Sequence, residues 1–445
     1  MEKDKSKNRI RKYILFLSLT LHAGMLFSQQ NSLPQQWDLQ TCINYALANN
    51  IQVKQAVAGK ESSKVDTKLA RAALFPSLSA SINQNLNNYP FPTDDSSSSL
   101  TTGNYGINAS WQIFDGGART NNIKQADINN EIAQLNIEES KNNIKLSIIQ
   151  NYLQILYADE AMKTCENAVE LSAEQLESNK EKLKTGIATK SDVAQWESQH
   201  ASDLYQLTNA KVTLENYKLL LKQLLELDTL ETMNIVIIEP DEEEVLTLLP
   251  DKNFIYQTAM NVMPQIKSSK LETEYSELGI AKAKAGYLPK ISLQAGAVTG
   301  NVYNHSTYDF GTQLKNNWNN TIGISVSIPI FSNREVKSAV EKAQINVETS
   351  KLNGLSIQKE LHANIETAYL NAINAQSQYI AAKEKVKSSR ESYNVLDEQF
   401  RLGLRNTIEL LTEKNTLINA QHELLQAKYM ALLSRKVLDY YQGLI

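Results

Sequence analysis

The chain has 445 residues, of which 42% are hydrophobic and 21% are charged, and its formal net charge at pH 7 is −4. That length suffices for two or three ordinary domains, but 16 glycines and 9 prolines are few, which favours long elements with few breaks. The slightly acidic balance argues against a nucleic-acid partner. The two cysteines are too few for a disulfide framework.

The N-terminal segment, residues 1–28, has the pattern of a secretory signal peptide. Six basic residues lie between Lys3 and Lys12, and an apolar run over residues 13–27 precedes Ser28. We expect cleavage near Ser28, which removes six basic and two acidic residues and changes the net charge from −4 to −8. An uncleaved anchor is the alternative, but the apolar run is short for a helix that spans a membrane.

Two alternating stretches between residues 77 and 114 predict a β-hairpin. Over residues 77–87 one face carries apolar residues and Gln84, whereas the other carries only serine and asparagine. The alternation returns over residues 105–113, after a polar loop. A period of two makes a strand with two unlike faces. Strands of roughly nine to eleven residues with one apolar and one uncharged polar face suit a membrane barrel, with lipid outside and water inside.

Long helices flank this hairpin. Residues 38–71 have a helical pattern with a break near Asn50, and residues 118–184 contain neither proline nor glycine. A helix over 118–184 would be about 100 Å long. Gly186 marks a turn, and the helical pattern resumes over residues 191–227. There, apolar residues at spacings of three and four form a seam typical of coiled coils: Leu207, Ala210, Leu214, Tyr217, Leu221 and Leu224.

The second half of the chain repeats the first. Phe114 corresponds to Phe331 and Gly186 to Gly403, at the same offset in the numbering. We interpret this as a tandem duplication. The predicted units are a signal peptide (1–28), a first repeat (29–227), an acidic junction (228–253) and a second repeat (254–445). The first repeat contains a hairpin at about 77–114 and helices over 118–184 and 191–227, and the junction contains a short strand at 235–238. The second repeat contains a hairpin at about 290–331 and helices over 335–400 and 407–442.

Each repeat thus offers two membrane strands, and the whole chain offers four. Single-chain barrels start at about eight strands, and each orphan backbone group at an open edge in lipid costs several kcal/mol. We therefore expect a mainly α protein whose transmembrane β-barrel closes between chains. The residues expected to face its water-filled lumen are Ser79, Ser81, Asn83, Asn108, Ser110, Ser292, Gln294, Ser325 and Ser327.

The chain resembles the TolC family of outer-membrane efflux proteins. The features that carry the resemblance are the signal peptide, the duplicated helix–hairpin–helix–helix unit and four motifs: the F-D-G-G-A-R strand exit, the L-K-T-G and F-R-L-G-L-R turns, and the closing Q-x-E-L-L-x-A-K-Y helix. The resemblance covers the whole mature chain. It implies a homotrimer in the outer membrane of a Gram-negative-type bacterium, with a twelve-stranded barrel on a twelve-helix periplasmic tunnel that opens when its helices untwist.

The resemblance also implies function and partners. Such a channel-tunnel is the exit duct of a tripartite efflux system, docked to a periplasmic adaptor (membrane fusion) protein and to an inner-membrane pump of the resistance-nodulation-division, ABC or major-facilitator type. Two alternatives stay open. One is a type I secretion duct for polypeptides, and the other is a non-conducting coiled-coil protein that spans the periplasm.

In this family the tunnel closes at the helical turns that match residues 183–193 and 400–410. The resemblance implies a latch between Arg405 and Asp192, with Ser191 as a further acceptor, and charge-assisted bonds at a wet helix end suit a latch that must break. It also implies that Glu409 forms a ring around the axis, and such a ring selects for cations. The alternative is that Asp192 and Glu409 merely cap helices, since acids in a first turn are favoured by the helix dipole.

Two residues depart from the family pattern in these turns. Thr412 stands where a second acid is often found, and Phe400 replaces a tyrosine that helps the latch in some members. Both departures predict a gate held by fewer polar contacts.

Nothing in the sequence points to an enzyme. His422 is followed by Glu423, but the second histidine of a helical zinc motif is missing, and no phosphate-binding glycine loop occurs. We expect no catalytic residues, no metal and no cofactor, and we interpret Cys165 and Tyr152 as packing residues.

Overall fold

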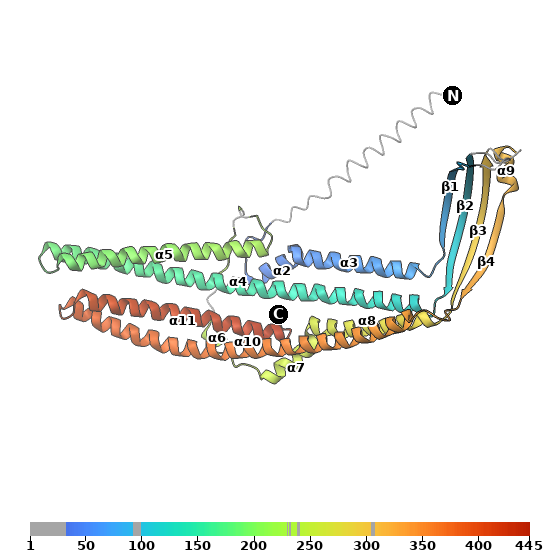
Figure 1. Cartoon of the computed structure of the whole chain (residues 1–445). Coiled ribbons are helices and arrows are strands. Elements are labelled where there is room, and N and C mark those ends of the chain that lie inside the picture. Colours follow the sequence, from blue (N-terminus) through green and yellow to red (C-terminus); the bar gives the residue numbers. More distant parts are fainter. Residues whose placement is uncertain (1–32, 92–98, 229, 231–232, 238–240, 304–307) are drawn as a thin grey trace, which may run out of the picture.

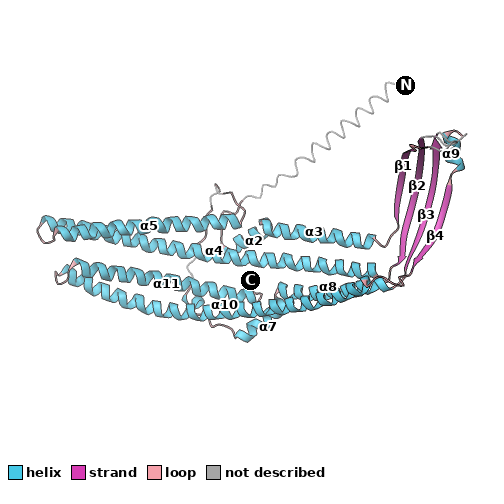
Figure 2. Ribbon diagram, viewed as in Figure 1, coloured by secondary structure: helices cyan, strands magenta, loops and turns pink. Residues whose placement is uncertain are grey.

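The computed structural model describes residues 33–91, 99–228, 230, 233–237, 241–303 and 308–445. The protein is mostly helical, with long helices along its body and one antiparallel sheet at one end (Figures 1 and 2). The signal peptide expected over residues 1–28 lies outside the described residues.

The sheet joins the two predicted hairpins. Its strands are β1 (Ser77–Asn88), β2 (Ser99–Phe114), β3 (Lys290–Tyr303) and β4 (Asn319–Ser327). They lie in the order β1-β2-β3-β4 and every neighbouring pair is antiparallel, so β2 of the first half pairs with β3 of the second. β4 ends before Pro329, short of the predicted residue 331, because proline has no N–H for the ladder.

Two helical hairpins of equal size form the body. α4 (Ala118–Lys184) and α10 (Glu335–Arg401) have 67 residues each, and α5 (Lys190–Leu224) and α11 (Thr407–Tyr441) have 35 each. α10 starts at the same offset from α4 as α11 does from α5, and this is the offset seen in the sequence. α3 and α5 follow one another along α4, and α8 and α11 do so along α10 (Figure 1).

Shorter helices complete the chain. They are α2 (Leu39–Asn49), α3 (Ile51–Ala72), α6 (Glu242–Val245), α7 (Lys252–Val262), α8 (Pro264–Lys284), the 3-10 turn η1 (Ala285–Tyr287) and α9 (Phe310–Asn316). The side chains of Asp38 and Asn50 cap α2 and α3, which explains the break between them. The short strand expected at residues 235–238 is a single bridge from Ile235 to Trp37, and residue 238 lies outside the described residues.

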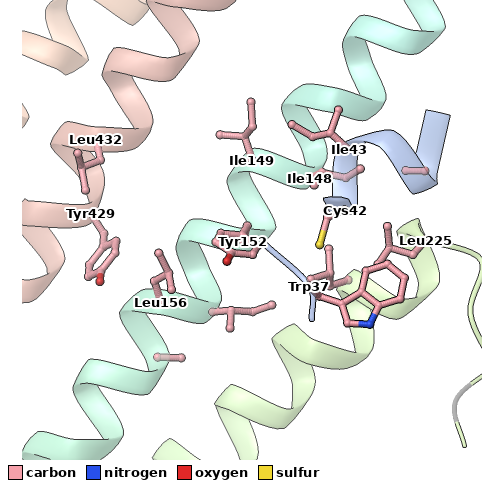
Figure 3. Close-up of a cluster of buried hydrophobic side chains, with 14 of the residues drawn as sticks. Trp37, Cys42, Ile43, Ile148, Ile149, Tyr152, Leu156, Leu225, Tyr429 and Leu432 are labelled. Atoms are coloured by element: carbon pink, nitrogen blue, oxygen red, sulfur yellow. The ribbon is translucent and has the colours of Figure 1, made fainter. Parts of the chain in front are cut away.

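The main core lies where α2, α4 and the end of α5 meet, with α11 against it (Figure 3). Trp37, Cys42 and Leu225 are at most 1% exposed there, and Tyr152 of α4 packs among them. Burial raises the pKa of both Cys42 and Tyr152 to about 12, so both stay neutral. Tyr152 donates its hydroxyl proton to the carbonyl of Val236, which ties the inter-repeat junction to α4.

The turn from strand to helix differs between the two halves. Gly116 and Gly117 lead from β2 into α4 with φ of 71° and 86°. Their equivalents in the second repeat, Asn333 and Arg334, also have positive φ, at 46° and 66°. A Cβ on Gly116 would lie 2.7 Å from the carbonyl oxygen of Ala285. The first half therefore needs glycine at this position for space as well as for conformation.

Among the described residues, no helix combines the length and the apolar character needed to cross a membrane.

Candidate functional site

Two matching turns close the helical hairpins at the end of the body that lies away from the sheet (Figure 1). Gly186 and Gly403 stand after α4 and α10 with φ of 78° and 74°, the left-handed conformation that ends many helices. α5 then starts at a capping box of Thr189 and Asp192, and α11 at one of Asn406 and Glu409. Both acids predicted for the gate are therefore also helix-capping groups.

Asp192 joins the two turns. Its Oδ2 accepts hydrogen bonds from the backbone N–H of Thr189 at 2.9 Å and from the hydroxyl of Thr189 at 2.6 Å. Its Oδ1 accepts one from the hydroxyl of Thr407, at 2.7 Å, across from α11. Hydrogen bonds from the Thr189 side chain first, and then from Thr407, lower the pKa of this carboxyl group. Thr407 is 3% exposed, so the contact is partly shielded from water.

Within the single chain Arg405 binds groups of its own turn and not Asp192, so the expected latch stays a prediction. Its Nη1 lies 3.0 Å from Oε1 of Glu409, and its Nε donates to Gln399 at 3.0 Å. The reason is local, because residues four apart face each other on a helix and the oxygens of Asp192 already bind Thr189 and Thr407. Ser191 is exposed at the start of α5.

Glu409 faces two groups of its own turn. Its Oε2 accepts from the backbone N–H of Asn406 at 3.1 Å, and Arg405 binds the other oxygen. The Asn406 bond first, and then Arg405, lower the pKa of Glu409. A second contact between the hairpins lies beside these turns, where Nζ of Lys182 is 5.1 Å from the ring centroid of Phe400.

Sequence reasoning missed a buried ion pair further along the same seam. Nζ of Lys414 on α11 lies 2.6 Å from Oδ2 of Asp203 on α5 and 3.3 Å from the carbonyl oxygen of Ala168 on α4. The Lys414 and Asp203 side chains are 1% and 7% exposed. Burial lowers the pKa of Lys414, and Asp203 opposes that shift. Breaking such a pair by removing one partner costs about 3–5 kcal/mol.

One more polar contact lies beside the pair, where Gln199 donates to Oδ1 of Asp203 at 2.7 Å and Asn415 directly follows Lys414. Gln199 of α5 and Asn415 of α11 exchange amide hydrogen bonds at 3.3 and 3.2 Å. The signal that could have revealed the ion pair is the presence of Lys414 and Asp203 in the buried stripes of their helices, four and seven residues from the buried Leu410 and Trp196. A charged residue in such a stripe needs a partner.

The sheet register places the nine predicted lumen residues on one face. Paired residues of neighbouring strands lie side by side, and Ser79 pairs with Asn108, Ser110 with Gln294, and Ser292 with Ser325. The opposite face holds the rows Leu78–Ala109–Ala295–Ile322 and Trp111–Leu293–Ile324. Lys290 is the only Lys, Arg, Asp or Glu within the four strands.

The described residues contain no group of three or more His, Cys, Asp and Glu side chains placed to hold a metal ion.

Comparison with known proteins agrees with this geometry. The family model described as "Outer membrane efflux protein" matches residues 42–225 and 255–443. Outer membrane protein TolC of Escherichia coli is 23% identical over 430 residues, covering 94% of this chain and 84% of the relative. Proteases secretion protein PrtF of Dickeya chrysanthemi is 20% identical over 445 residues, covering 98% and 92%. The crystal structure of the Campylobacter jejuni CmeC outer membrane channel superposes with a TM-score of 0.77 at 21% identity, covering 91% and 85%.

Proposed function

Because the chain belongs to the family of outer membrane efflux proteins, we propose that it forms a homotrimeric channel-tunnel that serves as the exit duct of a tripartite export system. Three copies of β1–β4 close a twelve-stranded barrel in the outer membrane, and the long helices extend it through the periplasm. A periplasmic adaptor and an inner-membrane pump of the resistance-nodulation-division, ABC or major-facilitator type dock at the turn end.

The observation that carries this proposal is the two-faced sheet with two free edges. On the isolated chain Leu78, Ile82 and Ile322 are 75%, 79% and 79% exposed, all on the apolar face. An apolar surface of this kind needs lipid or protein to cover it. Among the strands that the structure describes, β1 and β4 each lack a neighbour on one side. Unpaired backbone groups are costly in lipid, so the edges must be paired by further copies.

The polar face of the sheet then lines the lumen, with the nine residues named above, and the turns form the gate. In a trimer three copies of Asp192–Thr407 and three of Arg405–Glu409 surround the axis. The Glu409 carboxylates form a ring that favours cations. Each Glu409 is paired with Arg405, which reduces the negative charge of the ring.

The similarity to PrtF, whose name is that of a protease secretion protein, supports a second cargo class of exported polypeptides. The pump largely chooses the cargo, and the same tunnel serves small molecules and polypeptides. Deletion of the gene separates the two. Hypersensitivity to toxic compounds indicates small-molecule efflux, whereas loss of a secreted protein from the medium indicates polypeptide secretion.

The proposal is tested with the full-length protein purified from outer membranes. We expect a heat-stable trimer on electrophoresis and discrete single-channel conductance in planar bilayers. A trimer without conductance would instead indicate the non-conducting periplasm-spanning protein. A monomer would contradict barrel closure between chains.

A further inference from the structure

The contacts between the two helical hairpins differ in how deeply they are buried. At the turns, the carboxyl group of Asp192, which accepts from Thr407 across the hairpins, is half-buried, and so are Lys182 and Phe400. Water can replace these contacts when the turns separate. The Lys414 and Asp203 side chains are 1% and 7% exposed within a single chain, so no second copy is needed to bury them. Separation at that level would leave two charges without their partners.

Lys414 inserts from α11 between both helices of the other hairpin. Its ammonium group meets Asp203 of α5, the carbonyl oxygen of Ala168 on α4, and the ring of Trp196, whose centroid is 5.9 Å away. Trp196 is 0% exposed. One side chain thus fixes α11 to α4 and α5 together.

This ion pair has no counterpart in the repeat. The equivalent of Lys414 in the first repeat is Glu197, which is exposed and lies 3.9 Å from Lys180 within its own hairpin. The equivalent of Asp203 in the second repeat is Ala420. The pair therefore interrupts an otherwise repeated pattern, and it does so at a contact between the hairpins.

On the basis of the proposed channel function, we propose that Lys414 and Asp203 form the fulcrum of the gate, a contact that stays closed while the hairpin ends swing apart. The moving part is the segment between the turns and this pair, where Asp192 and Thr407 separate. Lys414 and Asp203 act as positioning residues, because they hold the turns in register without touching the cargo.

Cys165 can report whether α11 separates from α4 and α5 at the Lys414–Asp203 pair. Its Sγ lies 4.0 Å from Nε2 of His422, and it is 6% exposed. It lines a cavity of about 340 Å³ together with Asp203, Gln199, Asn415 and His422. If α11 left α4 and α5 here, the thiol would become accessible from water. Cys42 is replaced by alanine so that Cys165 is the only thiol.

The experiment compares conductance with maleimide labelling of Cys165 in the full-length trimer. In the Cys42→Ala background, Asp192→Ala with Thr407→Val removes the contact between the turns. We expect conductance to rise severalfold while the labelling rate stays within about twofold of the parent, because the fulcrum is intact. Asp203→Asn should raise the labelling rate at least about tenfold, because it leaves Lys414 buried without its counter-charge.

Three results would overturn the fulcrum, and two of them concern the Asp192→Ala, Thr407→Val variant: labelling of Cys165 that rises in parallel with conductance, or unchanged conductance. Unchanged labelling in Asp203→Asn would also contradict it. If Asp203→Asn fails to assemble, Asp203→Leu with Lys414→Met replaces it, since a well-packed apolar pair should keep Cys165 protected in both states. Failure of the proposed function is distinguishable, because then the parent protein itself does not conduct.

Discussion

The sheet end and the turn end of the molecule are held in place by different kinds of side chain. At the sheet end, nearly all side chains are uncharged, and the alternation of apolar and polar faces determines orientation. At the turn end, the contacts between hairpins are made by carboxylates, hydroxyls, amides and ammonium groups. The sheet end is suited to a permanent position between lipid and water. The turn end is suited to contacts that break and form again.

The difference shows how burial determines the cost of a polar contact. Exposed ion pairs are worth about 0–1 kcal/mol, because water competes for the same groups. The same chemistry, when buried, is costly to break. Because Asp192 is only half-buried whereas Lys414 and Asp203 are almost fully buried, we expect the gate to open at the turns and to stay closed at Lys414 and Asp203.

The largest effect is expected at the buried pair. Asp203→Asn should lower the free energy of unfolding by about 3–5 kcal/mol, because it leaves Lys414 buried without its counter-charge. The measurement is urea unfolding of the purified trimer, followed by helical circular dichroism. Glu197→Gln, in the exposed pair with Lys180, is the matched control and should cost less than about 1 kcal/mol. Equal effects in the two variants would remove the distinction between buried and exposed contacts.

At the sheet end the largest effect comes from a charge on the apolar face. Ala109→Lys or Ile324→Lys should each weaken assembly by about 2–4 kcal/mol, because the lysine would face lipid near mid-strand. Recovery of heat-stable trimer from the outer membrane measures this. Ser110→Lys and Ser325→Lys are the neighbouring controls on the polar face and should be tolerated. If all four were tolerated equally, the assigned faces would be wrong.

The sequence was sufficient to predict the periodic features of this fold. The two-residue period gave the strands and their faces, and the absence of proline and glycine gave the bounds of α4. The pairing of Arg405 with Glu409 within one turn was not predicted, because the family resemblance pointed only to Asp192 as its partner. Lys414 and Asp203 meet across 211 residues of chain, and α9 lies inside a predicted hairpin loop. No local period encodes either feature.

The junction between the sheet and the helices should be sensitive to one methyl group. Gly116→Ala should destabilise the protein by about 1–3 kcal/mol, because φ is positive and the new Cβ would meet the Ala285 carbonyl. Gly117→Ala is the control, with φ of 86° but no atom within 4 Å of the new Cβ, and should cost about 1 kcal/mol. Thermal dissociation of the trimer measures both. A larger loss in Gly117→Ala would show that conformation alone matters at this turn.

A smaller effect is expected from the contact between the turns. Thr407→Val keeps the shape of the side chain but removes the hydrogen bond to Asp192, which is worth about 1 kcal/mol at this half-buried site. The population of the open state should rise about fivefold. It is measured as the fraction of time that single channels in planar bilayers spend in the open state. Arg405→Ser should also raise conductance, but by less, because Arg405 binds Glu409 and Gln399 of its own hairpin. A larger rise in Arg405→Ser would show that Arg405 reaches Asp192 when the assembled gate is closed.

The smallest effect concerns pH. The pKa of Asp192 is lowered from 3.8 by hydrogen bonds, first from Thr189 and then from Thr407. A lowered pKa means that the ionised carboxylate is favoured in the folded, closed arrangement, so its contribution is complete above pH 3.8 and is lost as pH falls through the lowered value. Conductance should therefore be constant from pH 8 to about pH 5 and rise only in more acidic solution. Asp192→Asn should abolish that rise, whereas a rise near neutral pH in the parent protein would place the titrating group elsewhere than at the turns.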